Sequence, residues 1–266
     1  SMYLPPDSFK QIQQQSRSRF TGIGAVLEER PREGILQVLM PIPEGPAAQA
    51  GVREGDLIVA VDGISTQEIG PTEASRRLLG ETNSPVTIDL TRADSEKQSL
   101  TLARQDVPLV TVVGYDLRPD RTWNYWLPVT QNASTKTPIR PAYVRITRFA
   151  GDTADRLHRI LKDLESEGMT HLVLDLRFNP GGLMESAIDV ADLFIADGII
   201  VRVRDRQGTE KDRPAVPLGT FLDLKLLVLV NAESASGSEI VAAAVQDAGR
   251  GIIVGSRSFG KGSVQE

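Results

Sequence analysis

Apolar residues follow two different patterns in the two halves of the chain. Between residues 20 and 104, short apolar runs alternate with turn residues, and residues 86–90 (VTIDL) alternate between apolar and polar positions. A period of two puts every second side chain on one face of a strand, as in a half-buried sheet. Two helices are predicted: a short one over 46–51 that is closed by Gly51, and one over 72–79 with Gly80 as its C-cap. The first half is therefore predicted to be mainly β.

The second half alternates apolar runs with amphipathic segments. Residues 171–176 and 224–230 are nearly continuously apolar, which is typical of strands buried on both faces of a sheet. Residues 152–168 place apolar side chains on one helical face, and residues 239–248 are an Ala-rich helical segment. Strands that alternate with helices indicate an α/β domain.

The length of the chain agrees with this division. At roughly 150 residues per domain, 266 residues suggest two domains. We expect four parts: a polar tether at 1–19, a mainly β domain at 20–104, a proline-rich connector at 105–141 and an α/β domain at 142–266.

The composition excludes several kinds of catalytic and binding site. A net charge of −5 gives no basic excess for a nucleic-acid groove. The chain has no cysteine, which excludes thiolate nucleophiles and Cys-ligated zinc, and its two histidines do not form an H-E-x-x-H motif. No run of about 18 apolar residues occurs in this sequence. We therefore expect no metal, no cofactor and no nucleic-acid partner, and a hydrolase built here needs a base other than histidine.

Four segments of the first half share the sequence features and the order of a known binding module. They are 20–24 (FTGIG), 46–51 (PAAQAG), 54–58 (EGDLI) and 61–63 (VDG). In these segments the chain resembles a PDZ domain, which binds the free C-terminus of a protein. The alternative is a plain β domain whose glycines only make turns.

The first of these segments has the residues that a carboxylate site needs. Glycines at positions 22 and 24 can adopt positive φ and expose their amides, and a nest of free N–H groups binds a terminal carboxylate. The candidate tail-binding residues are Thr21, Gly22, Ile23 and Gly24. The apolar side chains of Ile23 and Val26 favour an apolar last residue in the ligand.

Two strands of the second half are followed by glycine or serine. Residues 179–182 (NPGG) predict a tight turn whose amides can approach a ligand. Ser236 follows another strand and opens a helix, where free amides and the helix dipole favour an oxyanion. Ser236 and Glu239 also match an S-x-x-E capping box, which this stretch alone favours. Ser234 and Ser238 are alternative nucleophiles.

The segment after the last predicted strand allows three interpretations. Residues 255–261 match most of a P-loop, but Gly262 stands where Ser or Thr would bind magnesium, which disfavours a nucleotide. Residues 258–261 match S-x-x-K, but Gly260 disfavours a helix there and no K-T-G follows. The third interpretation is a base, Lys261, presented by a Gly-rich turn.

Six spaced segments of the second half match one protease family. They are 143–146 (YVRI), 175–177 (DLR) with 179–182 (NPGG), 189–194 (DVADLF), 234–236 (SAS) with 238–240 (SEI), 246–247 (QD), and 259–262 (FGKG) with 264–265 (VQ). In these segments the chain resembles the C-terminal processing peptidases, tail-specific serine proteases with a Ser–Lys dyad and a PDZ domain. The resemblance implies an α/β protease core of the Clp protease/crotonase type, a PDZ domain inserted in it or preceding it, and a core that continues beyond residue 266.

The resemblance also implies a role for each matched residue. Ser236 is the expected nucleophile, Lys261 the expected base, and Gln265 the residue that orients the lysine. A lysine acts as a base only when it is neutral, and burial favours the neutral form by lowering its pKa.

The backbone amides that would stabilise the oxyanion are carried over in the same way. They belong to Gly237 and to the Gly181-Gly182 turn, with Gly182 preferred. Phe178 stands where the family commonly has asparagine, and Gly237 where it has alanine, but both positions keep their backbone donors.

These observations predict a serine endopeptidase that cleaves proteins near their C-termini, with the PDZ domain recognising the tail of the substrate. The expected partners are proteins or peptides with a free apolar C-terminus, without nucleotide or nucleic acid. The family implies export from the cytoplasm, and a homo-oligomer is compatible with it. The alternative is a non-catalytic PDZ scaffold with a degenerate protease domain.

Overall fold

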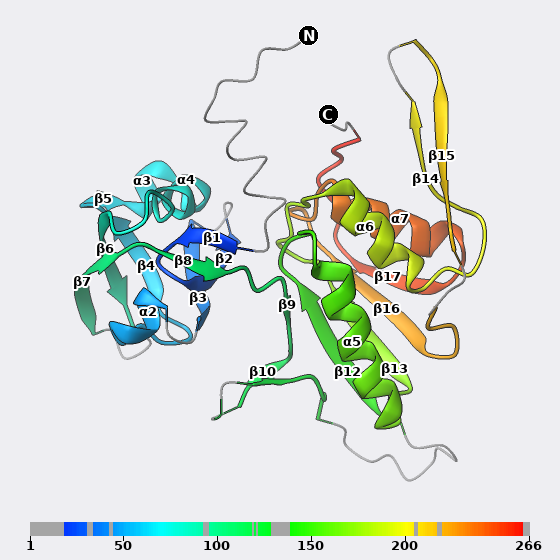
Figure 1. Ribbon diagram of the computed structural model, residues 1–266, viewed down its shortest axis with the longest axis horizontal. Helices are drawn as coiled ribbons and strands as arrows, with labels where there is room; N and C mark the ends of the chain where they lie inside the picture. The colour runs from blue at the N-terminus through cyan, green and yellow to red at the C-terminus, as the bar shows by residue number, and fades with distance from the viewer. Residues whose placement is uncertain are drawn as a thin grey trace. The chain divides into compact units, whose positions relative to one another are not determined.

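The computed structural model describes residues 19–30, 34–42, 45–92, 96–118, 120, 122–128, 139–204, 207–216 and 220–262. The chain divides into two compact units, Ser1–Val110 and Thr111–Glu266 (Figure 1). The expected tether lies outside the described residues, apart from Arg19. The expected connector is divided, because its first residues belong to the first unit and the others to the second.

The first unit is built on a twisted antiparallel sheet with the strand order β2-β3-β4-β6-β7, and β5 pairs with β4. Strands β1 and β8 form a separate antiparallel pair. The strands are β1 (Arg19–Gly22), β2 (Ala25–Arg30), β3 (Ile35–Pro41), β4 (Leu57–Val61), β5 (Ile64–Ser65), β6 (Pro85–Thr91), β7 (Lys97–Ala103) and β8 (Gln105–Pro108). The helices are α2 (Pro46–Gln49), α3 (Thr66–Ile69) and α4 (Pro71–Arg77).

The predicted alternation appears in the sheet of this unit. Val86, Ile88 and Leu90 of β6 are at most 1% exposed, while the residues between them face outward. The strand β8 extends the mainly β region beyond residue 104, because Gln105–Pro108 pairs residue by residue with β1. Val107 is buried there, which explains why these residues stay with the first unit.

The second unit contains a five-stranded sheet with the order β17-β16-β13-β12-β9, in which only β9 runs antiparallel. Its strands are β9 (Val112–Val113), β12 (Pro141–Ile146), β13 (His171–Asp175), β16 (Lys225–Val230) and β17 (Gly251–Gly255). Two antiparallel pairs lie outside it: β10 (Asp116–Leu117) with β11 (Trp123–Asn124), and β14 (Ile199–Arg204) with β15 (Glu210–Pro214). The helices are α5 (Thr153–Ser166), α6 (Met184–Asp192) and α7 (Gly237–Asp247).

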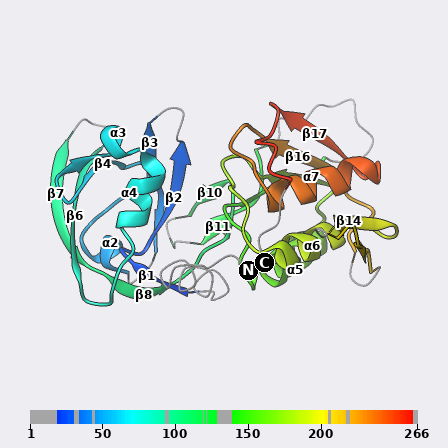
Figure 2. The same ribbon diagram turned by 90° about the horizontal axis from the view of Figure 1, so that it is seen from above.

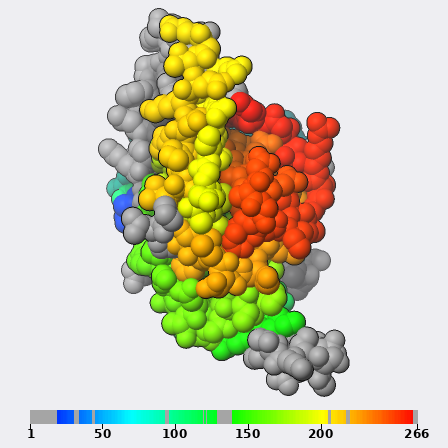
Figure 3. Space-filling view, turned by 90° about the vertical axis from the view of Figure 1, so that its right-hand side faces the viewer, coloured from blue at the N-terminus to red at the C-terminus, as the bar shows by residue number. Residues whose placement is uncertain are grey.

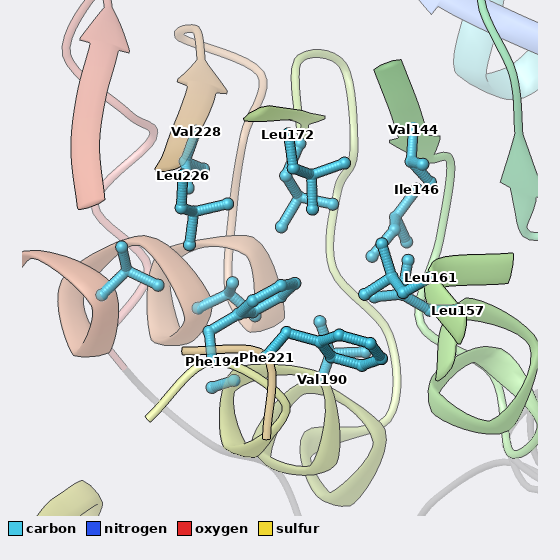
Figure 4. Close-up of a cluster of buried hydrophobic side chains, with 14 of the residues drawn as sticks. Val144, Ile146, Leu157, Leu161, Leu172, Val190, Phe194, Phe221, Leu226 and Val228 are labelled. Carbon is cyan, nitrogen blue, oxygen red and sulfur yellow. The ribbon is translucent and has the colours of Figure 1, made fainter. Parts of the chain in front are cut away.

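The three helices lie on one face of this sheet (Figures 1 and 2). The core between the two layers is formed by apolar side chains from the strands and helices, including Val144, Leu161, Leu172, Phe194 and Val228 (Figure 4). Each of these five is at most 1% exposed. The β14–β15 hairpin runs beside α7 on the face shown in Figure 3. The predicted combination of a mainly β region and an α/β core is confirmed.

Candidate active site

The parallel sheet brings two predicted site segments to one edge. Strands β13 and β16 are neighbours in register, with Asp175 opposite Leu229. The segments that follow them, residues 176–183 and 231–236, therefore leave the sheet at the same end. In open α/β sheets this carboxyl end is where ligands bind.

Ser236 occupies a strained backbone position at the start of α7. It is the N-cap residue of the helix, with φ 53° and ψ −112°. A positive φ is uncommon for a residue with a side chain, and sparsely populated conformations of this kind cost about 1–3 kcal/mol. The surrounding contacts must therefore hold Ser236 in place, and such strain is found most often at functional sites.

The glycine turn packs directly onto Ser236. A Cβ atom on Gly181 would lie 2.8 Å from the Cβ of Ser236, and one on Gly182 would lie 2.1 Å from the carbonyl oxygen of Phe149. The φ angles of the two glycines are +100° and +149°. Only glycine satisfies both the space and the backbone conformation, and this allows the turn to approach the serine.

Asn179 holds this turn against both the sheet and the helix. Its side chain is fully buried, its Nδ2 donates to the carbonyl of Ile146 at 2.9 Å, and its Oδ1 accepts the N–H of Gly181 at 2.8 Å. Its own carbonyl accepts the N–H of Ala235 at 3.1 Å and the hydroxyl of Ser238 at 3.0 Å. Asn179 is thus bound to the residues on either side of Ser236.

The three candidate glycine amides are not equivalent. The N–H of Gly181 is already donated to Asn179. Among the described residues, the N–H groups of Gly182 and Gly237 have no acceptor. The nitrogen of Gly237 would lie 3.0 Å from a Cβ on Gly181, so it faces the glycine turn. Gly182 and Gly237 are therefore the two amides available to an oxyanion.

The three serines of this segment also differ in their bonding. Ser234 and Ser238 are fully buried. The hydroxyl of Ser234 donates to the carbonyl of Leu176 at 2.8 Å, and that of Ser238 donates to Asn179. Ser236 is half-buried. Because the hydroxyls of its two rivals are committed to backbone carbonyls, Ser236 is the serine best placed to react.

Glu239 completes a capping box with Ser236 and also binds the Gly-rich turn. Its Oε2 accepts the N–H of Ser236 at 2.8 Å and the N–H of Lys261 at 2.9 Å. Its Oε1 accepts the hydroxyl of Ser258 at 2.8 Å and the N–H of Gly260 at 2.7 Å. Partial burial alone would raise the pKa of Glu239, but these hydrogen bonds outweigh it and hold the pKa below its ordinary value of 4.5.

Lys261 is brought near the helix by its backbone rather than by its side chain. The residue is exposed, and no hydrogen bond joins its Nζ to the hydroxyl of Ser236. The amides of Gly260 and Lys261 are occupied by Glu239, so they are not free to cradle a phosphate, which disfavours the P-loop interpretation. Ser258 lies outside any helix, which disfavours the S-x-x-K interpretation. Gln265 lies outside the described residues.

Sequence reasoning missed a cluster of hydrogen-bonded side chains around one buried carboxylate, at the end of β13. Asp175 is fully buried, accepts a hydrogen bond from Tyr143 at 2.6 Å and forms an ion pair with Arg177 at 2.7 Å. Burial is the main cause that raises the pKa of Tyr143, followed by the charge of Asp175. A carboxylate at the end of an apolar strand was the available signal. The cluster fixes the strand end from which the glycine turn begins.

The two histidines lie near the amino ends of the strands, opposite to the end that carries Ser236. His171 is the first residue of β13 and lies opposite Lys225, the first residue of β16. His158 of α5 contacts Phe221 edge-on, shortly before β16 begins. Neither is at the carboxyl end of the strands. Among the described residues, no group of three His, Cys, Asp or Glu residues could hold a metal ion.

In the first unit, the structure distinguishes the two glycines of the candidate tail-binding segment. Gly24 has φ +72°, as the sequence predicts, but the residue is buried. Gly22 does not adopt positive φ, and space is what requires glycine there. A Cβ on Gly22 would lie 3.0 Å from the ring of Phe20 and 3.2 Å from the carbonyl of Leu78. Ile23 is 2% exposed and packs in the core, while Thr21 accepts the N–H of Gly80 through its carbonyl.

Two family models match the chain, one in each of its two units. Residues 140–266 match the family model of peptidase family S41, and residues 37–92 match that of the PDZ domain. The chain is 32% identical to a carboxyl-terminal-processing protease of Picosynechococcus sp. over 98% of its length, and 35% identical to a carboxy-terminal-processing protease of Bartonella bacilliformis over all of it.

A solved structure gives the same result. The photosystem II D1 C-terminal processing protease is 32% identical, with a TM-score of 0.56, over 99% of this chain and 67% of that one. The chain belongs to the carboxyl-terminal-processing peptidases of peptidase family S41. It spans 57–59% of the length of three curated relatives that it matches. Among the described residues, no helix is long and apolar enough to cross a membrane.

Proposed function

We propose that this chain is part of a serine endopeptidase that cleaves proteins near their C-termini with Ser236 and Lys261 as its dyad. Family membership supports the reaction class. The observation that supports the residues is the position of Ser236, a strained and half-buried N-cap residue beside the free amides of Gly182 and Gly237.

The proposed reaction begins with proton transfer from Ser236 to the neutral amine of Lys261. The serine Oγ attacks the carbonyl carbon of the scissile bond, and the N–H groups of Gly182 and Gly237 stabilise the oxyanion. The dipole at the start of α7 acts in the same direction. The C–N bond then breaks as the lysine ammonium returns the proton to the leaving amine. Water, deprotonated by the same lysine, hydrolyses the acyl-enzyme.

The base requires a change of environment before this step. Lys261 is exposed to solvent in this structure, whereas a catalytic lysine base needs an environment that excludes water. We propose that a bound substrate chain covers the amine, and that Gln265 orients it. Desolvation then lowers the pKa of the lysine, so that it acts as a base only when substrate is present.

The first unit supplies a surface for the substrate tail. Strand β2 is the terminal strand of its sheet, and α4 packs beside it. In peptide recognition by strand addition, an extended ligand pairs with such an edge. We propose that the segment from Thr21 to Gly24 receives the carboxylate of a free apolar C-terminus and that this binding gates cleavage.

One matching relative, from Arabidopsis thaliana, is named a chloroplastic peptidase, and we propose an extracytoplasmic location.

Cleavage of an unstructured protein with an apolar C-terminus tests the proposal. The wild-type protein, Ser236→Ala and Lys261→Ala are compared at equal concentration. Loss of cleavage in both variants, with binding of a tail peptide retained, supports the dyad. Cleavage that persists in Ser236→Ala removes the proposed nucleophile. Tail binding without cleavage in the full-length wild-type protein favours the scaffold function.

A further inference from the structure

The carboxylate of Glu239 joins two segments that are far apart in the sequence. It accepts a backbone N–H from its own helix start, at Ser236, and three donors from the turn that follows β17, up to 22 residues further along the chain. All four distances lie between 2.7 and 2.9 Å. Four good donors on one carboxylate is close to its full acceptor capacity.

The turn has few other attachments. Within residues 256–262, the one further backbone hydrogen bond among the described residues runs from the N–H of Phe259 to the carbonyl of Ser234, at 3.0 Å. Phe259 itself is 65% exposed. Gly260, with φ +91°, and Gly262 leave the backbone beside Lys261 with many accessible conformations once it is released. The Glu239 contact is therefore the main restraint on the backbone position of Lys261.

We propose that Glu239 is a positioning residue that fixes the backbone of Lys261 against that of Ser236, and so sets the distance over which the lysine amine can reach the serine hydroxyl. This inference rests on the proposed Ser236–Lys261 dyad. Glu239 takes no proton in the reaction and need not touch the substrate. It acts through the other two residues.

The chemistry of the contact makes substitutions at this position informative. A glutamine has the same length but presents N–H donors on one side, so at least one backbone N–H would face another donor. In its best orientation the glutamine keeps its carbonyl oxygen on the N–H groups of Ser236 and Lys261. Its amide nitrogen then faces Ser258, whose hydroxyl can accept a hydrogen bond, and Gly260, whose N–H cannot. Alanine removes all four contacts. The expected order of effect is therefore alanine, then glutamine.

The test combines kinetics with hydrogen exchange on the full-length protein. For Glu239→Gln we expect kcat to fall about 10-fold and KM to change less than 2-fold, and for Glu239→Ala a fall in kcat of about 100-fold. Amide exchange in peptides covering 258–262 should rise at least 10-fold in both, while exchange in the centre of α7 stays unchanged. Glu165→Gln, at an exposed carboxylate on α5, is the control and should keep near wild-type kcat.

The outcomes separate this inference from the proposed function. If Ser236→Ala and Lys261→Ala are inactive but Glu239→Ala retains wild-type kcat, the dyad stands and the positioning role is overturned. If Ser236→Ala still cleaves, the dyad is wrong, and exchange at 258–262 then decides whether Glu239 restrains the turn. Unchanged exchange there in Glu239→Ala overturns the inference whatever the activity. A folded state with a Tm close to wild type, measured for each variant, excludes general unfolding as the cause.

Discussion

Ser236 and Lys261 donate their backbone N–H groups to the same oxygen atom, Oε2 of Glu239, at 2.8 and 2.9 Å. The two residues of the proposed dyad are thus related through their main chains, although their side chains make no hydrogen bond with each other. The serine is fixed by the glycine turn and by its helix. Lys261 itself is held, among the described residues, by its one hydrogen bond to Glu239, and otherwise only through its neighbours in the turn. The geometry of the dyad is therefore more sensitive to changes around Lys261 than around Ser236.

Replacing Ser236 by glycine should abolish cleavage and should cost less stability than replacing it by alanine. Loss of a serine nucleophile lowers kcat by up to about 10⁶-fold. Glycine adopts φ 53° without penalty, so Ser236→Gly should be about 1 kcal/mol more stable than Ser236→Ala, which keeps the strain. Chemical denaturation of the two variants measures the difference. Equal stabilities would mean that the N-cap position is not strained in solution.

Gly182→Ala should be strongly destabilising and inactive. The added methyl group would lie 2.1 Å from the carbonyl oxygen of Phe149, at a φ of +149°. The backbone would have to shift, at a cost of at least about 3 kcal/mol. Gly208→Ala is the matched control, because its φ of +84° is also positive but nothing lies within 4 Å of the new atom. Its cost should be about 1 kcal/mol. Equal costs for both would contradict the close packing of the glycine turn.

Acid should release the Lys261 turn. The pKa of Glu239 is lowered in the folded protein, so its contribution to stability is present above the ordinary value of 4.5 and is lost as pH falls through the lower folded-state pKa. The four groups that hydrogen-bond to this carboxylate are uncharged N–H and O–H donors. The difference in unfolding free energy between wild type and Glu239→Gln should be constant from pH 7 to about pH 5 and shrink below 4.5. A difference that grows in acid would contradict this assignment.

Asp175→Asn should weaken the strand end without touching the proposed dyad. The buried carboxylate accepts hydrogen bonds from Tyr143 and Arg177, and the loss of a charged partner costs about 2 kcal/mol. Glu165→Gln in the exposed pair with Lys162 should cost less than about 0.5 kcal/mol. Thermal and denaturant unfolding of both variants give the comparison. A loss of similar size in each would show that burial of Asp175 adds nothing.

The sequence predicted those parts of the protein that depend on local pattern. The α/β alternation, the Gly-rich turns and the position of Ser236 before α7 follow from periodicity and capping preferences. The pairing of β8 with β1 could not be predicted in this way, because it joins residues from 83 (Gly22 and Gln105) to 89 (Arg19 and Pro108) positions apart, and only Val107 is strongly apolar in β8. The double role of Glu239 was equally hidden, since its capping-box motif explains one of its four hydrogen bonds. The other three depend on where β17 ends.

That dependence links the site to the pairing of the sheet. Ser236 follows β16 and Lys261 follows β17, and these neighbours pair in parallel with Leu229 opposite Val254. A slip of β17 by two residues would keep its faces correct but shift the turn by about 6.6 Å, well beyond hydrogen-bond length. Glu239 would then have no donors to accept from the turn. The contact thus forms only in correctly registered chains, and a misregistered β17 would leave a folded chain in which the proposed dyad cannot be assembled.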